Sequence, residues 1–295
     1  MLDKGPDQLG PANSGWRNNS PPRSVAHANV LMQTPTEALR QFVKRFVVVE
    51  FPFARKLRLL PDTNLVAEFR FRGEHVSDSN TNLPRAAISG LWDTARTRTY
   101  AGGSAILMAM FTEAGASSFL REPLDSLFNT TTAVEELLGC APELELLNQQ
   151  LVTAENHGQR IQIAERFLLN RIRNESLDPF VSAAVEHIEE SQTIVRINEL
   201  ARRVGLSQSA LERRFRRVVG TSPKHFSSIL RLKNAFRLRA RGQDFTSIAY
   251  SAGYSDQSHF TNEFKRVTGL APSAFFQQST VCRYSASLQV AFAAN

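Results

Sequence analysis

A segment near the C-terminal end of the chain is written twice, and this repeat constrains the fold more than any other feature of the sequence. In the first half of the repeat, Leu200, Ala201, Val204, Gly205 and Ser207 match Ile248, Ala249, Ala252, Gly253 and Ser255 at an offset of 48. In the second half, Phe215, Gly220, Pro223 and Phe226 match Phe264, Gly269, Pro272 and Phe275 at an offset of 49. Repetition at this period indicates one supersecondary unit used twice, with one residue inserted between its halves.

Each copy predicts two helices that meet at a sharp turn. The small and apolar residues of the first half have the spacing of one helical face. Gly205 and Gly253 can then adopt the positive φ of a turn, and Ser207 and Ser255 can cap a following helix. In that second helix Leu211 and Phe215, or Phe260 and Phe264, face inward and leave the other sides polar and basic. This is the helix-turn-helix arrangement, whose second helix enters the major groove of DNA, although similar helix pairs occur in bundles that bind nothing.

The distribution of charge favours the DNA-binding alternative. Between Arg196 and Arg283 the chain has sixteen Lys or Arg residues and five Asp or Glu residues, a balance of +11 against +7 for the whole chain. The basic excess is therefore concentrated on the repeat, where contact with a polyanion explains it. Residues 229–241 have helical spacing and join the two copies, so they predict a rigid connector between two reading heads.

At these positions the chain resembles the AraC/XylS family of bacterial transcription regulators. The resemblance covers residues 178–278 and is densest from Ala249 to Phe275, where a tyrosine, three phenylalanines, two glycines and a proline stand at the family's spacing. It implies a DNA-binding domain of seven helices. The first of these helices is expected to start at Asp178-Pro179, since Asp is a good N-cap and Pro a good first residue, and to turn Phe180, Ala184, Val185 and Ile188 inward.

The resemblance also assigns residues to DNA. Those expected to face the bases are Ser209, Glu212 and Arg213 in the first unit and Gln257, Ser258, Thr261 and Asn262 in the second. Those expected to face phosphates are Arg214, Arg216, Arg217, Lys265 and Arg266. An arginine can bind a guanine edge, Gln or Asn an adenine, and Glu a cytosine amino group. The alternative for each is a solvated helix face, and Glu212 can also simply pair with Arg216 four residues on.

The rest of the chain predicts a second, different domain. Residues 1–28 are rich in Gly, Pro, Asn and Ser and predict a disordered arm. Residues 65–72 alternate apolar and polar side chains like a half-buried strand, and residues 104–111 read as a more fully buried one. Helical spacing follows in three apolar sets: Leu120, Leu124 and Leu127; Leu144, Leu147 and Leu151; Ile161, Ala164, Leu168 and Ile172. The expected class is therefore α+β: a β-rich, barrel-like domain with following helices (residues 29–174), an all-α domain (178–280) and a tail (281–295).

Other classes of function find little support in the sequence. Among the strands only His75 could ligate a metal, and His157 and His187 fall on helical segments. Neither a nucleophile elbow nor a phosphate-binding glycine loop occurs. Cys140 and Cys282 stand far apart, and no apolar stretch has the length of a signal peptide core or a membrane span. The sequence predicts a soluble, cytoplasmic protein that is not an enzyme and needs no cofactor or metal.

Two hypotheses about function remain. The first is a sequence-specific transcription regulator whose two helix-turn-helix units read adjacent major grooves of a promoter. In the AraC/XylS family the preceding domain often senses a ligand or forms a dimer, so double-stranded DNA, RNA polymerase, a small-molecule effector and a second copy are the expected partners. The alternative is an enzyme or small-molecule-binding protein that carries a DNA-binding tail. The sequence does not identify the effector or the operator, and it does not indicate whether the protein activates or represses transcription.

Overall fold

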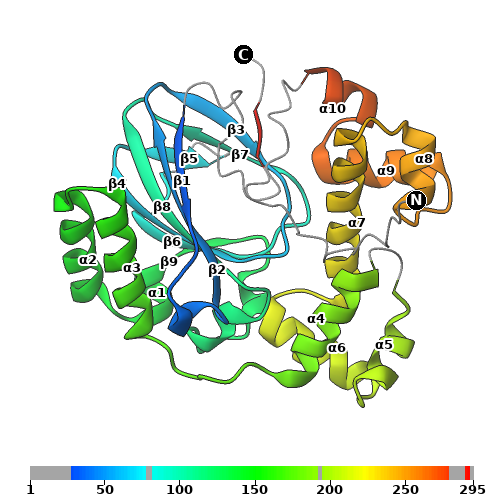
Figure 1. The fold of residues 1–295 in the computed structure, drawn as a ribbon, viewed down its shortest axis with the longest axis horizontal. Helices are drawn as coiled ribbons and strands as arrows, with labels where there is room; N and C mark the ends of the chain where they lie inside the picture. Colours follow the sequence, from blue (N-terminus) through cyan, green and yellow to red (C-terminus); the bar gives the residue numbers. More distant parts are fainter. Residues whose placement is uncertain (1–27, 78–81, 192–194, 279–289, 293–295) are drawn as a thin grey trace, which may run out of the picture.

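The computed structural model of the chain describes residues 28–77, 82–191, 195–278 and 290–292. The arm expected at residues 1–28 lies outside these ranges except for its last residue, and so does most of the expected tail. Within the described residues, strands and short helices come first and an all-helical part follows (Figure 1). This order confirms the expected α+β class.

Two antiparallel sheets form the N-terminal domain. The first contains, in order, β1 (Asn29–Gln33), β2 (Val43–Phe51), β8 (Ser104–Phe111), β4 (Val66–Arg72), β6 (Ala86–Ser89) and β9 (Thr131–Ala133). The second contains β10 (Val290–Phe292), β3 (Arg55–Leu59), β7 (Arg96–Tyr100) and β5 (His75–Ser77). Because β10 belongs to the expected tail, the end of the chain returns to the N-terminal domain and pairs with β3. The two sheets share an apolar core that includes Phe51, Leu57, Tyr100 and Ile106, so the barrel-like body is a two-sheet sandwich.

The central strands of the first sheet are buried on both faces. One face meets the second sheet, and the other is covered by helices, with α2 (Ala141–Thr153) in contact with β4 and with α3 (His157–Leu169). All eight residues of β8 are accordingly buried. The alternation in residues 65–72 predicted one solvated face, and for Glu68 this is wrong: its side chain is buried and pairs with Arg98 of the second sheet. A polar residue can face inward here because its partner is supplied across the sandwich.

The helical part contains the seven helices that the resemblance implied. They are α4 (Pro179–Ser191), α5 (Ile197–Arg203), α6 (Gln208–Val219), α7 (Pro223–Ala240), α8 (Phe245–Ser251), α9 (Gln257–Thr268) and α10 (Pro272–Gln278). Asp178 caps α4, since its Oδ1 accepts the backbone N–H groups of Phe180 and Val181 at 3.0 and 3.2 Å. The expectation that Phe180 faces inward is wrong: its side chain is exposed, and Val181 takes the buried position.

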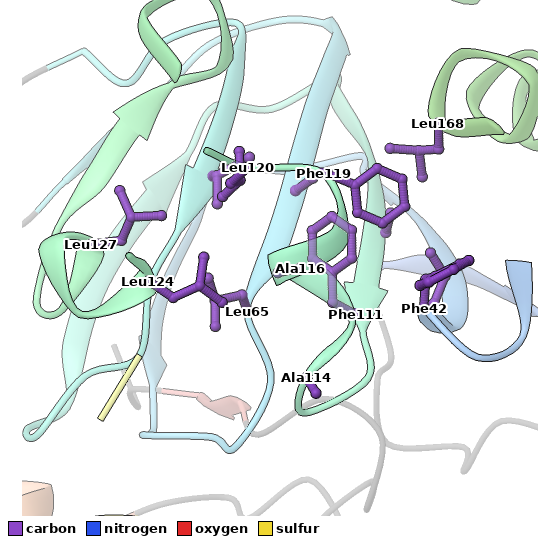
Figure 2. Close-up of a cluster of buried hydrophobic side chains, with 14 of the residues drawn as sticks. Phe42, Leu65, Phe111, Ala114, Ala116, Phe119, Leu120, Leu124, Leu127 and Leu168 are labelled. Carbon is purple, nitrogen blue, oxygen red and sulfur yellow. The ribbon is translucent and has the colours of Figure 1, made fainter. Parts of the chain in front are cut away.

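The first helix-turn-helix unit shares a core with the N-terminal domain. Leu124 and Leu127, expected on a helix, lie instead in a 3-10 turn, η3 (Leu124–Leu127), after a similar turn η2 (Gly115–Ser118) and before the short helix α1 (Val134–Leu138). Figure 2 shows these leucines beside Leu65 and Leu120. Helix α6 packs on both turns, and one continuous apolar cluster runs from the sheet into α4–α6 and the start of α7. The backbone at Gly220 comes so close that an added Cβ would lie 3.0 Å from the Leu124 carbonyl oxygen.

The second unit has its own core and touches the N-terminal domain mainly through polar contacts. Its cluster joins α7 to α8, α9 and α10 and includes Leu60 of the N-terminal domain, with Ala95 packed against it. The Ala95 N–H donates to the Val267 carbonyl at 2.7 Å, and Arg58 donates to the Thr268 carbonyl at 3.1 Å. The two repeated units are therefore attached to the N-terminal domain in different ways.

A pair of carboxyl groups meets where α4 crosses the end of β8. Glu113 accepts hydrogen bonds from Lys44 at 3.0 Å and from Asn64 at 3.1 Å. The carboxyl group of Glu189, on α4, interacts with that of Glu113. Burial, together with the charge of Glu113, raises the pKa of Glu189 to about 7. This interdomain contact is therefore more stable when Glu189 is protonated.

Glu189→Gln is expected to stabilise the protein at pH 8 and to flatten its pH dependence. Because the pKa of Glu189 is raised on folding, its contribution is fully present below its ordinary pKa of 4.5 and is lost as the pH rises to about 7. Glutamine removes the charge and can still donate a hydrogen bond, and solvent screening limits the gain to about 1 kcal/mol. Urea denaturation at pH 5 and pH 8 measures the difference, with the exposed Glu190→Gln as control. Lower stability of E189Q than of the wild type at pH 8 would contradict the account.

Candidate DNA-binding surface

The first unit has the geometry expected of a helix-turn-helix. Helix α5 ends in a turn where Gly205 has φ +75°. Ser207 then caps α6, its Oγ accepting the Ala210 N–H at 3.2 Å. Leu211 and Phe215 are fully buried, so they fix which side of α6 faces solvent.

The second unit has the same geometry with one correction. Gly253 has φ +76°, and α9 follows the turn. The predicted cap Ser255 is wrong: Asp256 caps α9 by accepting the His259 N–H at 2.7 Å, while the Ser255 hydroxyl lies 3.0 Å from the His259 ring nitrogen. The residue inserted in the second copy lies in the turn itself. Asp256 is therefore the counterpart of Ser207 at the offset of 49.

Removing the Asp256 side chain is expected to loosen the start of α9. Asp256→Ala leaves an orphan N–H at the helix N-terminus, and such losses should lower the melting temperature by roughly 1–3 °C. Ser255→Ala, the matched control, should change the melting temperature by much less because Ser255 caps no backbone group. Differential scanning calorimetry compares the two. An equal fall in melting temperature for both substitutions would indicate that Ser255 also caps the helix.

Most of the residues expected to face bases lie on the exposed sides of α6 and α9. Ser209, Arg213, Gln257, Ser258 and Asn262 are exposed, and Glu212 and Thr261 are partly buried. Two of these side chains have partners within the protein. Glu212 accepts a hydrogen bond from Gln208 at 3.0 Å, and Gln257 accepts one from Thr246 at 2.7 Å. The bond between Thr246 and Gln257 joins the first helix of the unit to the second and orients the amide.

The residues expected to face phosphates fall into two groups. Arg216, Arg217, Lys265 and Arg266 are exposed, and within the described residues none of them forms an ion pair. Arg214 differs because its Nη1 lies 2.9 Å from Asp178 Oδ2, and its guanidinium stacks over the Phe180 ring at 5.2 Å. A phosphate would have to compete with this carboxylate for Arg214.

One exposed aromatic residue was missed by the sequence analysis. Tyr250 on α8 has 88% of its surface exposed. Its counterpart at the offset of 48 is Arg202 on α5, which is exposed as well. The repeat could have revealed that this position faces solvent in both units. It was overlooked because the two copies were aligned on the small and apolar residues around it.

Helix α7 sets the distance between the two units. It has 18 residues, so it is about 27 Å long at 1.5 Å per residue. Its core residues hold α5 and α6 near one end and α8 and α9 near the other (Figure 1). This length approaches the separation of ~34 Å between successive major grooves on one side of a duplex.

The described residues contain no group of three or more His, Cys, Asp or Glu side chains placed to hold a metal ion. In the same part of the chain, none of the helices combines the length and apolar character of a membrane span.

Comparison with known proteins supports the helix-turn-helix assignment. The helix-turn-helix domain family matches residues 200–278. A putative AraC-like transcription regulator of Streptomyces lividans is 32% identical over 107 residues, which are 35% of each chain. The Msm operon regulatory protein of Streptococcus mutans is 29% identical over 137 residues, 45% of this chain and 49% of that protein. The chain thus spans less than half the length of these relatives.

Among solved structures, ToxT from Vibrio cholerae aligns with 85% of this chain and 97% of its own, at 10% identity and a TM-score of 0.43. The AraC-type DNA-binding regulator from Chromobacterium violaceum is 26% identical, covers 32% of this chain and 88% of its own, and has a TM-score of 0.31. The matched relatives are named as transcription regulators, and the match falls on the two units described above. The C-terminal part of the chain therefore carries a helix-turn-helix domain that is similar to the domains of AraC-like transcription regulators.

Proposed function

We propose that the protein is a sequence-specific, DNA-binding transcription regulator that acts on promoter DNA in the cytoplasm. The observation that carries this proposal is the pair of amphipathic helices α6 and α9, each capped after a glycine turn and each presenting unpaired cations to solvent. Placing cations on an exposed helix costs little free energy, because water solvates them. Their contact with phosphates greatly increases the affinity for DNA, because counterions are released.

The exposed side chains of these two helices fall into two groups with different proposed roles. Arg213 and Asn262 are the residues assigned to base edges, because their planar groups can form two hydrogen bonds with a guanine or an adenine. Ser209, Glu212, Gln257, Ser258 and Thr261 complete the base-facing sets. Phosphate contacts are assigned to Arg216, Arg217, Lys265 and Arg266. Tyr250 and Arg202 extend the proposed DNA-binding surface and are expected to lie next to the duplex.

The N-terminal domain is proposed to regulate these helices. Its turns η2 and η3 pack directly on α6, so a change in the domain reaches the first unit without an intermediary. A small-molecule effector, a second copy of the chain and RNA polymerase are the further partners of such a regulator.

Binding of the purified chain to DNA from either side of its own coding region tests the proposal. Fluorescence anisotropy with overlapping duplexes should identify one that binds far more tightly than a scrambled duplex of equal length. If the four unpaired cations each meet a phosphate, the logarithm of affinity should fall with the logarithm of salt with a slope of about −4. Equal affinity for every duplex, or a complex that salt does not weaken, would refute the proposal.

A further inference from the structure

An arginine-lined cavity opens at the end of the N-terminal domain, just before residues 174–178, the linker that leads to α4. Its volume is ≈ 250 Å³, and three segments of the chain form its walls. Phe119 and Arg121 follow η2, Leu137 and Leu138 end α1, and residues 170–173 follow α3. The lining therefore combines three arginines, Arg121, Arg171 and Arg173, with apolar residues.

The positive charge of this cavity is largely uncompensated. In the described part of the chain, neither Arg121 nor Arg173 forms an ion pair. Arg171 has only a distant carboxylate, Glu143, whose oxygen lies 3.8 Å away. Its guanidinium is instead held over the Phe167 ring at 4.0 Å, which orients it before any ligand arrives. Three like charges around one space favour the entry of an anion, and guanidinium groups bind carboxylates through two parallel hydrogen bonds.

The apolar part of the lining is rigid. Phe119 is buried between Phe42 and Phe111, with ring centroids 5.8 and 5.3 Å apart (Figure 2). Leu137, Leu138 and Ile172 complete this part of the wall and are only partly buried. A fully polar anion such as phosphate would leave these side chains facing water, whereas a short hydrocarbon body would cover them.

We propose that this cavity binds a small organic acid, with its carboxylate among Arg121, Arg171 and Arg173 and its apolar body against Leu137, Leu138 and Ile172. The site lies outside the space between the two sheets, and its regulatory meaning rests on the function proposed above. The Arg173 N–H donates to the Ser118 carbonyl at 2.8 Å, and Ser118 belongs to the turn η2 on which α6 packs. The acid therefore binds where the linker is hydrogen-bonded to η2, the turn on which the first helix-turn-helix unit packs. Its binding favours one position of that unit.

Binding of hexanoate to the full chain, measured without DNA, tests the site. Hexanoate is expected to raise the melting temperature and to give a saturable calorimetric titration, because a ligand of the native state stabilises it. The matched probe 1-hexanol, which keeps the hydrocarbon and lacks the charge, should do neither. Arg121→Gln and Arg173→Gln should each weaken hexanoate binding about tenfold. Both residues are exposed, so neither substitution threatens the fold. Arg166→Gln, an exposed arginine of α3 outside the cavity, should leave hexanoate binding unchanged.

Three results of the binding experiment would overturn the site: no response to hexanoate at millimolar concentration, an equal response to hexanol, or full binding by the Arg121→Gln, Arg173→Gln double variant. A second measurement follows the affinity for the best duplex with and without hexanoate. A change in the wild type that is lost in the double variant supports the regulatory role. If hexanoate binds as expected but leaves DNA affinity unchanged, the regulatory role is wrong and the site stands. If hexanoate binds and no duplex is preferred, the proposed function fails instead.

Discussion

Replacing Arg213 and Asn262 together by alanine is expected to abolish the preference of the protein for its best duplex. Each bidentate contact to a base edge discriminates by about 1–3 kcal/mol, so the loss of both should lower specific affinity by about 100-fold. The two side chains lie on different recognition helices and are exposed, so the fold is not expected to change. Fluorescence anisotropy with the specific and the scrambled duplex measures both affinities.

Single substitutions at the phosphate-facing positions provide the matched controls. Arg217→Gln on α6 or Arg266→Gln on α9 should weaken binding to all sequences alike and reduce the salt slope by about 1. The two classes of residue are thereby separated by what they change: base-facing residues alter the ratio of affinities, and phosphate-facing residues alter both affinities. A double variant that bound its best site as the wild type does would show that the recognition helices are wrongly assigned.

Arg98→Met is expected to cost about 3–5 kcal/mol of folding free energy at pH 7, because it leaves the buried Glu68 carboxylate without its partner. Glu68 belongs to β4 and Arg98 to β7, so their ion pair joins the two sheets inside the sandwich. Arg98 also donates to the Ser89 hydroxyl at 2.8 Å. Although burial opposes it, the Glu68 carboxylate raises the pKa of Arg98, and burial with the same carboxylate raises the pKa of Tyr100.

The double variant Glu68→Gln, Arg98→Met separates the loss of a charge partner from the loss of packing. With both charges of the pair removed, it should recover most of the stability that Arg98→Met loses. Urea denaturation of the full chain at pH 7 measures the wild type, Arg98→Met and the double variant. A double variant no more stable than Arg98→Met would mean that packing, and not the uncompensated charge, determines the cost.

The buried ion pair also marks the limit of what the sequence could reveal about the N-terminal domain. The alternation from Leu65 to Phe71 correctly placed apolar side chains on a buried face, which the structure shows to be the face that meets the helices. It could not show that a second sheet covers Glu68, because the partner Arg98 is thirty positions away in an unremarkable run of arginines and threonines. Similarly, the spacing of Leu124 and Leu127 fits a helix as well as the 3-10 turn that supports α6, since both bury apolar residues.

The DNA-binding domain was far more predictable, because the repeat supplies each position twice. Its seven helices, its glycine turns and the inward positions of Leu211, Phe215, Phe260 and Phe264 were all foreseen. The exceptions are local. The cap moved from Ser255 to Asp256 because an insertion can be placed on either side of a turn residue. Phe180 faces solvent because Val181, an equally apolar neighbour, takes the core and Arg214 covers the phenyl ring.

The unequal attachment of the two units has a consequence for operator geometry. Since α6 is fused to the turns η2 and η3 by a common apolar core, a rotation of the N-terminal domain carries the first reading head along as one block. The second reading head is connected to the N-terminal domain through α7, a small apolar contact at Leu60 and a few hydrogen bonds. On the proposed function, a half-site under α6 would be held in fixed phase with the N-terminal domain, whereas a half-site under α9 would tolerate more variation in spacing and in the curvature of the DNA.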